Sequence, residues 1–334
     1  MKNVFRGHSH KAEISMTEKS KQIILPKRLK KGDLIGIVSP SAAIAPEVLP
    51  ILRKGREFLH NLGFRTEVSK NHLKELDGSA GTPEERAEDI NDMFGDSRID
   101  AIICSQGGDT ANSILPYLDF KLIKENPKIF QGISDITVLL NVIQSQTGQV
   151  TFHGNDLIWG FGRKPSAYDI QEFTNRLITG EIGALRKNSR WKSVRSGNAE
   201  GRLMGGNLRC MLKLAGTGYQ PDYSDSILFL EAFEVTSGEC DYMFHQMKQM
   251  GAFEGIKGVL VGYVWGMQKS VKARKQAQME DVLNRITSEY DFPIVKCNDF
   301  GHNCSNTTLP LGVHARLSAA DSAPGLEILE NCVY

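Results

Sequence analysis

Residues 34–41 read LIGIVSPS, and this short segment already predicts the architecture. The apolar run Leu34–Val38 is typical of a strand buried on both faces, and the serines and proline after it indicate a turn. Beyond the turn, apolar residues recur at helical spacing until Gly63, a residue type that often ends helices. The order strand, turn, helix favours a parallel sheet that is covered by helices.

The same order continues along the next ninety residues. Thr82-Pro83-Glu84-Glu85 combines a capping hydroxyl, a proline at the first helical position and a glutamate at the third, which predicts a helix start. The further elements expected in chain order are a strand over 99–104, a helix through 114–118, a strand over 128–133, a helix over 136–144 and a strand over 149–152. This alternation predicts an α/β fold with a mostly parallel sheet flanked by helices, of the flavodoxin or Rossmann type.

The length of 334 residues exceeds the usual span of one domain, so we expect two. We predict a polar extension over 1–23, a first α/β domain over 24–165, a polar linker over 166–200 and a second, smaller α/β domain over 201–334. Within the second domain we expect strands at 227–230, 259–264 and 294–296, and helices at 241–250 and 276–290.

The composition narrows the classes of partner. Forty Lys and Arg against 39 Asp and Glu give a net charge of +1, which argues against nucleic acid and anionic membranes as partners. No stretch approaches the roughly 18 apolar residues of a membrane helix, and the first residues lack the apolar segment of a signal peptide. Six cysteines without a CxxC pair argue against a disulfide framework. We therefore expect a cytoplasmic protein that acts on a small molecule.

Ser134 is the first candidate for chemistry. It stands between the predicted strand over 128–133 and the following predicted helix, where a nucleophile on a strand-to-helix turn would be. The surrounding Gly132-Ile133-Ser134-Asp135 is not a complete GxSxG pattern. A serine at such a junction is also a common helix N-cap, and the residues alone leave both interpretations open.

Gly107-Gly108 follows the predicted strand over 99–104. Without side chains, the backbone amides of two glycines are open to a ligand and could form an oxyanion hole, although a tight turn explains them equally well. Neither GxGxxG nor GxxxxGK is present, so the sequence offers little support for a phosphate-binding loop.

His302, next to Gly301, is placed in an accessible loop, and Glu231 directly follows a buried strand. A carboxylate at a strand end can fix the tautomer of a catalytic histidine. Cys297, His302 and Cys304 form a local cluster, but it lacks a fourth ligand at the spacing of a zinc site. We therefore expect neither a metal nor a cofactor.

Six segments, found in this order, resemble the LD-carboxypeptidase family of serine peptidases, which includes the microcin C self-immunity peptidases. They are residues 31–41, 115–119, 132–137, 201–208, 228–231 and 300–302. The resemblance extends from about residue 24 to the C-terminus. It implies a hydrolase that cleaves an amide bond through an acyl-enzyme, without metal or cofactor, and that forms a homodimer.

The resemblance also implies the roles of single residues. Ser134 would be the nucleophile, His302 the general base and Glu231 the carboxylate that orients the base, with Glu234 as a second candidate for this acid. The amides of Gly108 and Asp135 would form the oxyanion hole. Further candidates for substrate contact are Gly107, Asp109, Asn207 and Trp191.

Two substrate classes fit the resemblance: a murein tetrapeptide that ends in D-alanine, and a peptidyl or aminoacyl nucleotide related to microcin C. Trp191 lies in a basic segment and would offer an aromatic face to a base, and Asn112-Ser113 is similar to the immunity branch. These features favour the nucleotide. A non-catalytic small-molecule binding protein on the same scaffold is the alternative from a different class.

Overall fold

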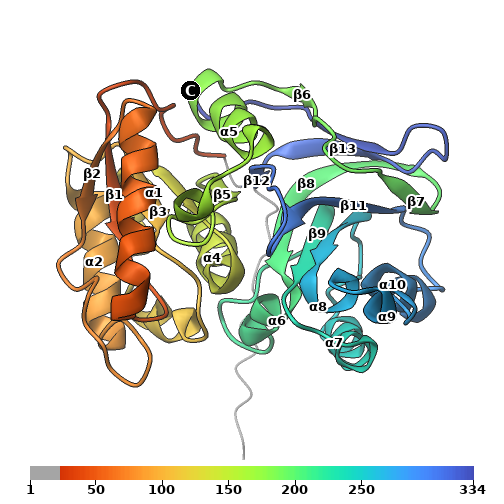
Figure 1. Ribbon diagram of the computed structural model, residues 1–334. Helices are drawn as coiled ribbons and strands as arrows, with labels where there is room; N and C mark the ends of the chain where they lie inside the picture. The colour runs from red at the N-terminus through yellow and green to blue at the C-terminus, as the bar shows by residue number, and fades with distance from the viewer. Residues whose placement is uncertain (1–22) are drawn as a thin grey trace, which may run out of the picture.

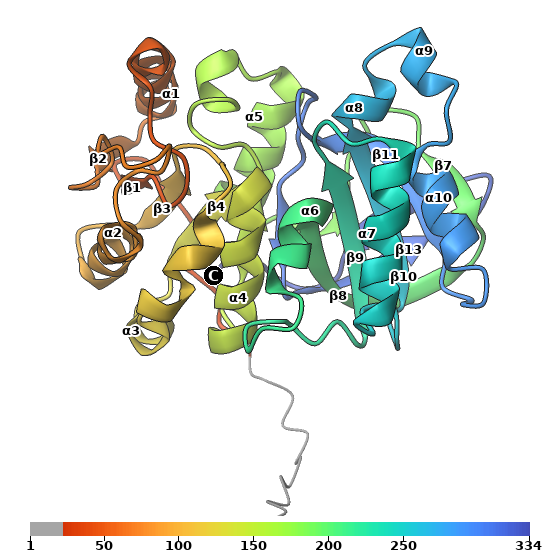
Figure 2. The same ribbon diagram turned by 90° about the horizontal axis from the view of Figure 1, so that it is seen from below.

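The computed structural model describes residues 23–334, so the predicted extension over 1–23 lies, apart from Ile23, outside the described residues. Two sheets lie side by side, and α4 (Thr137–Thr147) runs between them (Figures 1 and 2). The mixed α/β architecture confirms the predicted fold class.

The first sheet has the strand order β12-β5-β4-β3-β1-β2. Its strands are β1 (Leu34–Val38), β2 (Arg65–Val68), β3 (Ala101–Cys104), β4 (Ile129–Gly132), β5 (Thr151–His153) and β12 (Leu309–Leu311). β1 to β5 are parallel, in the order 2-1-3-4-5 that is found in flavodoxin. β12 comes from near the end of the chain and pairs antiparallel with β5.

Helices cover both faces of this sheet. Figure 2 shows α1 (Leu49–Asn61) on one face and α2 (Pro83–Gly95) and α3 (Phe120–Glu125) on the other. α2 begins with the predicted capping box, in which Thr82 and Glu85 bond each other's backbone amides. The short helices are η1 (Pro46–Val48), η2 (Ala111–Tyr117), η3 (Ser134–Ile136) and η4 (Phe161–Arg163). The helix expected through 114–118 is the 3-10 helix η2; Pro116 lies inside it and has no N–H for an α-helical bond.

The second sheet has the order β6-β14-β13-β8-β9-β10-β11-β7. Its strands are β6 (Gly183–Ala184), β7 (Lys192–Arg195), β8 (Asn198–Asn207), β9 (Ser226–Ala232), β10 (Gly258–Val264), β11 (Ile294–Gly301), β13 (His314–Ser318) and β14 (Gly325–Ile328). The remaining helices are α5 (Ala167–Phe173), η5 (Thr174–Thr179), α6 (Leu208–Met211), η6 (Leu212–Leu214), α7 (Ser237–Gln249), α8 (Trp265–Gln268), α9 (Val271–Arg274) and α10 (Met279–Ile286). The three strands expected here are confirmed as β9, β10 and β11. Residues 166–200, predicted as a linker, hold α5, η5 and the two edge strands β6 and β7.

The second sheet is buried on both faces in its centre, as the continuous apolar run of β9 requires. Ile227 and Phe229 point into the core that the second sheet shares with the first domain. Leu228 and Leu230 point the other way, into a separate core with α7 and α10. No helix among residues 23–334 combines the length and the apolar character that a membrane crossing needs.

Hydrogen bonds join α4 to β8 and thereby hold the two sheets together. The side-chain amide of Asn141 donates to the Gly205 carbonyl at 2.8 Å and its oxygen accepts from the Gly205 amide at 3.3 Å. One turn earlier, Thr137 Oγ1 accepts from the Asn207 amide at 2.9 Å. Gly206 lies between them with φ +135°, and a Cβ there would come within 2.4 Å of Thr137 Oγ1. This close approach requires glycine.

Gly206→Ala is expected to lower the free energy of unfolding by about 1–3 kcal/mol, because the added methyl group collides with Thr137 and the backbone is in a left-handed region. Urea denaturation followed by circular dichroism measures the change. Gly218→Ala is the matched control, since nothing lies within 4 Å of a Cβ built there, and it should change stability by less than about 0.5 kcal/mol. Equal stability of the two variants would contradict the described contact between α4 and β8.

Candidate active site

Ser134 lies on the turn between β4 and η3 and has a φ of 66°. A left-handed conformation costs a non-glycine residue about 1–2 kcal/mol, and such strain is characteristic of a nucleophile on a sharp strand-to-helix turn. The residue that caps η3 is Ile133, and no side chain forms a capping bond there. Ser134 therefore does not cap this helix, and its side chain lines a cavity.

The Gly107-Gly108 loop lies directly against this turn. A Cβ on Gly107 would be 2.6 Å from the Ser134 Cβ and 3.2 Å from the Asp135 amide nitrogen. Only glycine fits at this distance. The loop that follows β3 and the turn that follows β4 are thus packed backbone to backbone beside the Ser134 hydroxyl.

The carboxylate of Asp135 is fully buried and holds this loop in place. Its Oδ2 accepts from the Ser41 hydroxyl at 2.6 Å and from the Ala111 amide at 2.8 Å. Its Oδ1 forms an ion pair with Lys213 Nζ at 2.5 Å. Lys213 also donates to the Asp109 carbonyl at 2.8 Å, so a residue of the second domain braces both segments beside Ser134.

His302 and Glu231 are brought together by neighbouring strands of the second sheet. Glu231 lies in β9, and His302 follows β11 directly. His302 Nδ1 is 2.7 Å from Glu231 Oε2, and Glu231 Oε1 accepts from the Asn207 side-chain amide at 2.9 Å. Glu234, the second candidate acid, instead forms an exposed ion pair with Lys269.

Burial and charge set the ionisation of this pair. Burial alone would raise the pKa of Glu231, but the charge and hydrogen bond of His302 outweigh it, so the pKa of Glu231 lies below its usual value. Burial likewise works to lower the pKa of His302, and the Glu231 carboxylate, with Asp156 further away, raises it above the usual value. The ring of Phe233 covers the imidazole, with ring centroids 4.9 Å apart.

A second buried histidine, His153, lies behind the pair. Its ring packs between those of Phe229 and Phe300, and neither ring nitrogen has a hydrogen-bond partner within residues 23–334. Burial lowers the pKa of His153 to about 4, which keeps this imidazole neutral at physiological pH. A neutral His153 leaves His302 as the titrating histidine near Glu231.

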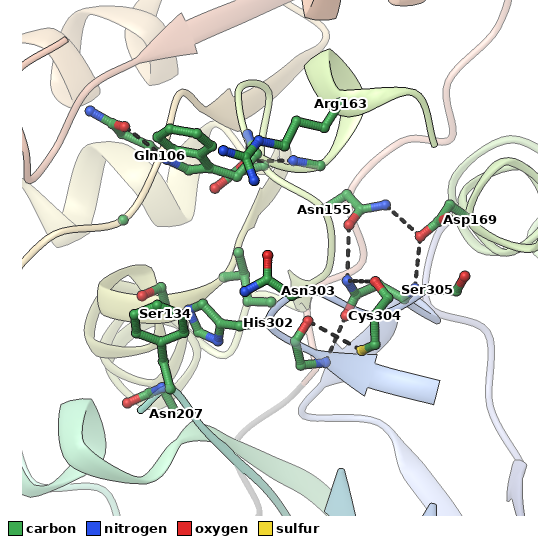
Figure 3. Close-up of a pocket in the computed structure, with 18 of the residues that line it drawn as sticks. Gln106, Ser134, Asn155, Arg163, Asp169, Asn207, His302, Asn303, Cys304 and Ser305 are labelled. Atoms are coloured by element: carbon green, nitrogen blue, oxygen red, sulfur yellow. Dashed lines mark hydrogen bonds between the residues drawn. The ribbon is translucent and has the colours of Figure 1, made fainter. Parts of the chain in front are cut away.

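Ser134 and His302 line one cavity of about 850 Å³ between the two halves of the chain. Figure 3 shows both residues with Asn207 on one side of the cavity, and Asn155, Asp169 and the loop after His302 on another. The other predicted residues that line it are Gly107, Gly108, Asp109 and Asn207. Glu231 is enclosed behind His302 and is not part of the cavity wall.

The structure places Trp191 elsewhere. Its side chain is only 7% exposed, its indole N–H donates to Asp299 at 2.7 Å, and it does not line the cavity. The tryptophan that does so is Trp159, which is 41% exposed and carries the Arg163 guanidinium 4.2 Å above its ring. Sequence reasoning missed Trp159, although its place just after β5 follows the rule that ligands bind at the carboxyl ends of parallel strands.

The cysteines of the described residues form no disulfide. All six are free thiols. Within residues 23–334 no three His, Cys, Asp or Glu side chains are arranged to hold a metal ion. Cys304 also lines the cavity and, like its neighbours Ser305 and Asn306, belongs to the loop that carries His302.

Comparison with known proteins agrees with this geometry. Residues 35–154 match the family model of the LD-carboxypeptidase N-terminal domain, and residues 200–317 match that of the C-terminal domain. The chain is 31% identical to a probable murein peptide carboxypeptidase of Bacillus subtilis, over 90% of this chain and 94% of that protein. It is 30% identical to the microcin C7 self-immunity protein MccF of Escherichia coli, over 87% of this chain and 92% of that protein.

Solved structures show the same likeness. MccF in its wild-type apo state has a TM-score of 0.84 at 27% identity, covering 93% of this chain and all of the MccF chain. An MccF-like protein from Bacillus anthracis has a TM-score of 0.82 at 30% identity, covering 92% of this chain and all of its own. MccF has also been solved in complex with aspartyl sulfamoyl adenosine. With both domain models matched and both halves of the fold shared, this chain belongs to the LD-carboxypeptidase family and is a serine-type carboxypeptidase.

Proposed function

We propose that Ser134, His302 and Glu231 form the catalytic triad and that the chain hydrolyses an amide bond of a small peptide. The observation that supports this most strongly is the hydrogen-bonded series Asn207, Glu231, His302, which ends in the cavity that also contains Ser134 on its strained turn. A binding protein without catalysis would have no use for a buried carboxylate behind an accessible imidazole.

The chemistry follows from the contacts of His302. Because Nδ1 is bonded to Glu231, Nε2 is the nitrogen left to take the proton of the Ser134 hydroxyl. The Ser134 oxygen adds to the amide carbonyl carbon, the C–N bond breaks, and His302 returns the proton to the leaving amine. Water then releases the acyl group by the reverse proton transfers.

The amides of Gly108 and Asp135 are the donors proposed for the oxyanion. Support for this comes from the packing of Gly107 against Ser134 and Asp135. Donors of this kind must be rigid before the charge develops. The Asp135 carboxylate and Lys213 provide that rigidity, since they hold both backbone segments.

Among substrates, a murein tetrapeptide ending in D-alanine is our first choice. A cavity of about 850 Å³ accommodates a short peptide, and the similarity to the murein peptide carboxypeptidase of Bacillus subtilis points the same way. A peptidyl or aminoacyl nucleotide is the second candidate. The exposed face of Trp159 favours it, whereas the buried Trp191 gives it no support.

The family resemblance further supports two proposals about the state of the protein. We propose that it forms a homodimer and that it works in the cytoplasm on substrates released there. Neither proposal enters the chemistry described above, because Ser134, His302 and Glu231 all come from one chain.

Ser134→Ala and His302→Ala should each lower kcat for the tetrapeptide by at least about a thousandfold, because each removes a group that acts in the same step. Release of D-alanine measures the rate, and circular dichroism checks the fold. The double variant should be hardly slower than either single one, since the two groups act as a unit. Near-normal turnover by Ser134→Ala would show that another residue is the nucleophile.

The pH profile tests the role of Glu231. The neutral form of His302 is the base, so kcat/KM should fall as the pH drops through a pKa raised above the usual 6.5. Glu231→Gln removes the carboxylate that raises this pKa, so the acidic limb should move to lower pH while the plateau falls roughly a hundredfold or more.

Glu234→Gln is the matched control for this profile, because Glu234 pairs with Lys269 at the surface. It should leave both limb and plateau unchanged. If the acidic limb of the kcat/KM profile shifted in Glu234→Gln and stayed unchanged in Glu231→Gln, Glu234 and not Glu231 would be the acid of the triad.

A further inference from the structure

We propose that the cavity wall formed by residues 155–166 binds the zwitterionic end of a substrate side chain, with Asp156 receiving an ammonium group and Arg163 a carboxylate. The inference rests on the proposed function. The ammonium and the carboxylate would belong to the acyl part of the peptide, which stays on Ser134 when the C-terminal residue leaves. They cannot both belong to the leaving residue, because its amino group forms the amide bond that is cleaved.

Asp156 is a buried carboxylate with one oxygen in use and one open. Only 2% of the residue is exposed, and it lines the cavity. Oδ1 accepts from the backbone amides of Trp159 at 2.7 Å and Gly160 at 2.9 Å. Oδ2 accepts no hydrogen bond from residues 23–334, and this oxygen remains in contact with solvent. This oxygen therefore opens into the cavity.

A buried carboxylate is costly unless a donor or a cation meets it. Burial raises the pKa of Asp156 to about 6, against the effect of its two backbone hydrogen bonds and of the nearby His302 and Arg163. At neutral pH the group is therefore mostly ionised. Within the described residues no cation forms an ion pair with Asp156. A positive group on the substrate would therefore supply the missing partner of this carboxylate.

Arg163 is held above the same wall. Its guanidinium lies 4.2 Å from the centroid of the Trp159 ring, and the Trp159 indole N–H donates to the Gln106 side chain at 3.0 Å. Figure 3 shows Arg163 across the cavity from Ser134 and His302. The turn that Asp156 stabilises carries Trp159, so the carboxylate and the guanidinium are positioned by one segment.

Of the other charged residues that line the cavity, Asp169 and Arg209 already have partners, and Asp109 belongs to the loop after Gly108 and not to the wall formed by residues 155–166. Asp169 is saturated by bonds from Asn155, Asn306 and Ser166. Arg209 is paired with Glu239 at 2.9 Å. Among the described residues that line the cavity, Arg163 and its neighbour Lys164 are the cations without an ion pair. The wall thus presents an open carboxylate and an open guanidinium, the complement of an ammonium and a carboxylate on one carbon.

The test compares tetrapeptides whose penultimate residue is lysine, Nε-acetyl-lysine or diaminopimelate, which adds a carboxylate beside the amine. Binding is measured by calorimetry in Ser134→Ala, which cannot turn the peptides over. Adding Asp156→Asn should weaken binding of the lysine peptide about 10- to 100-fold and of the acetylated peptide less than about threefold. The Asn oxygen still accepts the two backbone bonds, so the turn is preserved.

Adding Arg163→Gln should bring the affinity for the diaminopimelate peptide down to that for the lysine peptide. Equal binding of the lysine and acetyl-lysine peptides to Ser134→Ala, or equal losses for both with Asp156→Asn, would overturn the proposal. Cleavage by the wild type is measured in parallel. A binding preference for the lysine and diaminopimelate peptides without Ser134-dependent cleavage would support this subsite and refute the proposed hydrolysis. Ser134-dependent cleavage without such a preference would support the hydrolysis and refute the subsite.

Discussion

Thr137 and Asn141 lie one turn apart on α4, and their side chains bond the backbone of β8 where the two sheets meet. Ser134 precedes Thr137 by three residues. On the β8 side of the contact, the Asn207 side chain donates a hydrogen bond to Glu231, and Glu231 in turn bonds His302. One interface therefore fixes the nucleophile and the base relative to each other, although they come from different halves of the chain. A shift of α4 along β8 would separate them.

The buried carboxylates of the site differ in how their charge is balanced. Glu231 meets Asn207 with one oxygen and His302 with the other. Asp135 is satisfied by Ser41, the Ala111 amide and Lys213, and this makes it a rigid anchor for the loop beside Ser134. Asp156 uses only one of its oxygens. An unpaired charge is destabilising in the low-dielectric interior of a protein. The fully bonded Glu231 and Asp135 therefore have structural partners for both oxygens, whereas Asp156 has one oxygen open to a ligand.

Local patterns predicted the parallel half of the fold well. Buried strands such as β1 and β9 are apolar throughout, and Thr82 with Glu85 marks a helix start from four residues. Strands β2, β6, β7, β8, β12, β13 and β14 were not predicted. All of them except β8 have five residues or fewer, and β8 has no continuous apolar run because glycine and polar residues make up most of it. Trp191 and Trp159 look alike in the sequence; only the tertiary contact with Asp299 shows that the first is a buried structural residue. The structure likewise separates the two glutamates, because Glu231 is buried against Asn207 and His302 whereas Glu234 pairs with Lys269 at the surface.

The central claim is that His302, held by Glu231, activates Ser134. Labelling by a serine-reactive fluorophosphonate, followed by peptide mass mapping, tests it most directly because the reagent reports nucleophilicity without requiring the natural substrate. Modification should occur at Ser134 alone, and at least about a hundredfold more slowly in His302→Ala. Labelling of a different serine, or an unchanged rate at Ser134 in His302→Ala, would contradict the claim.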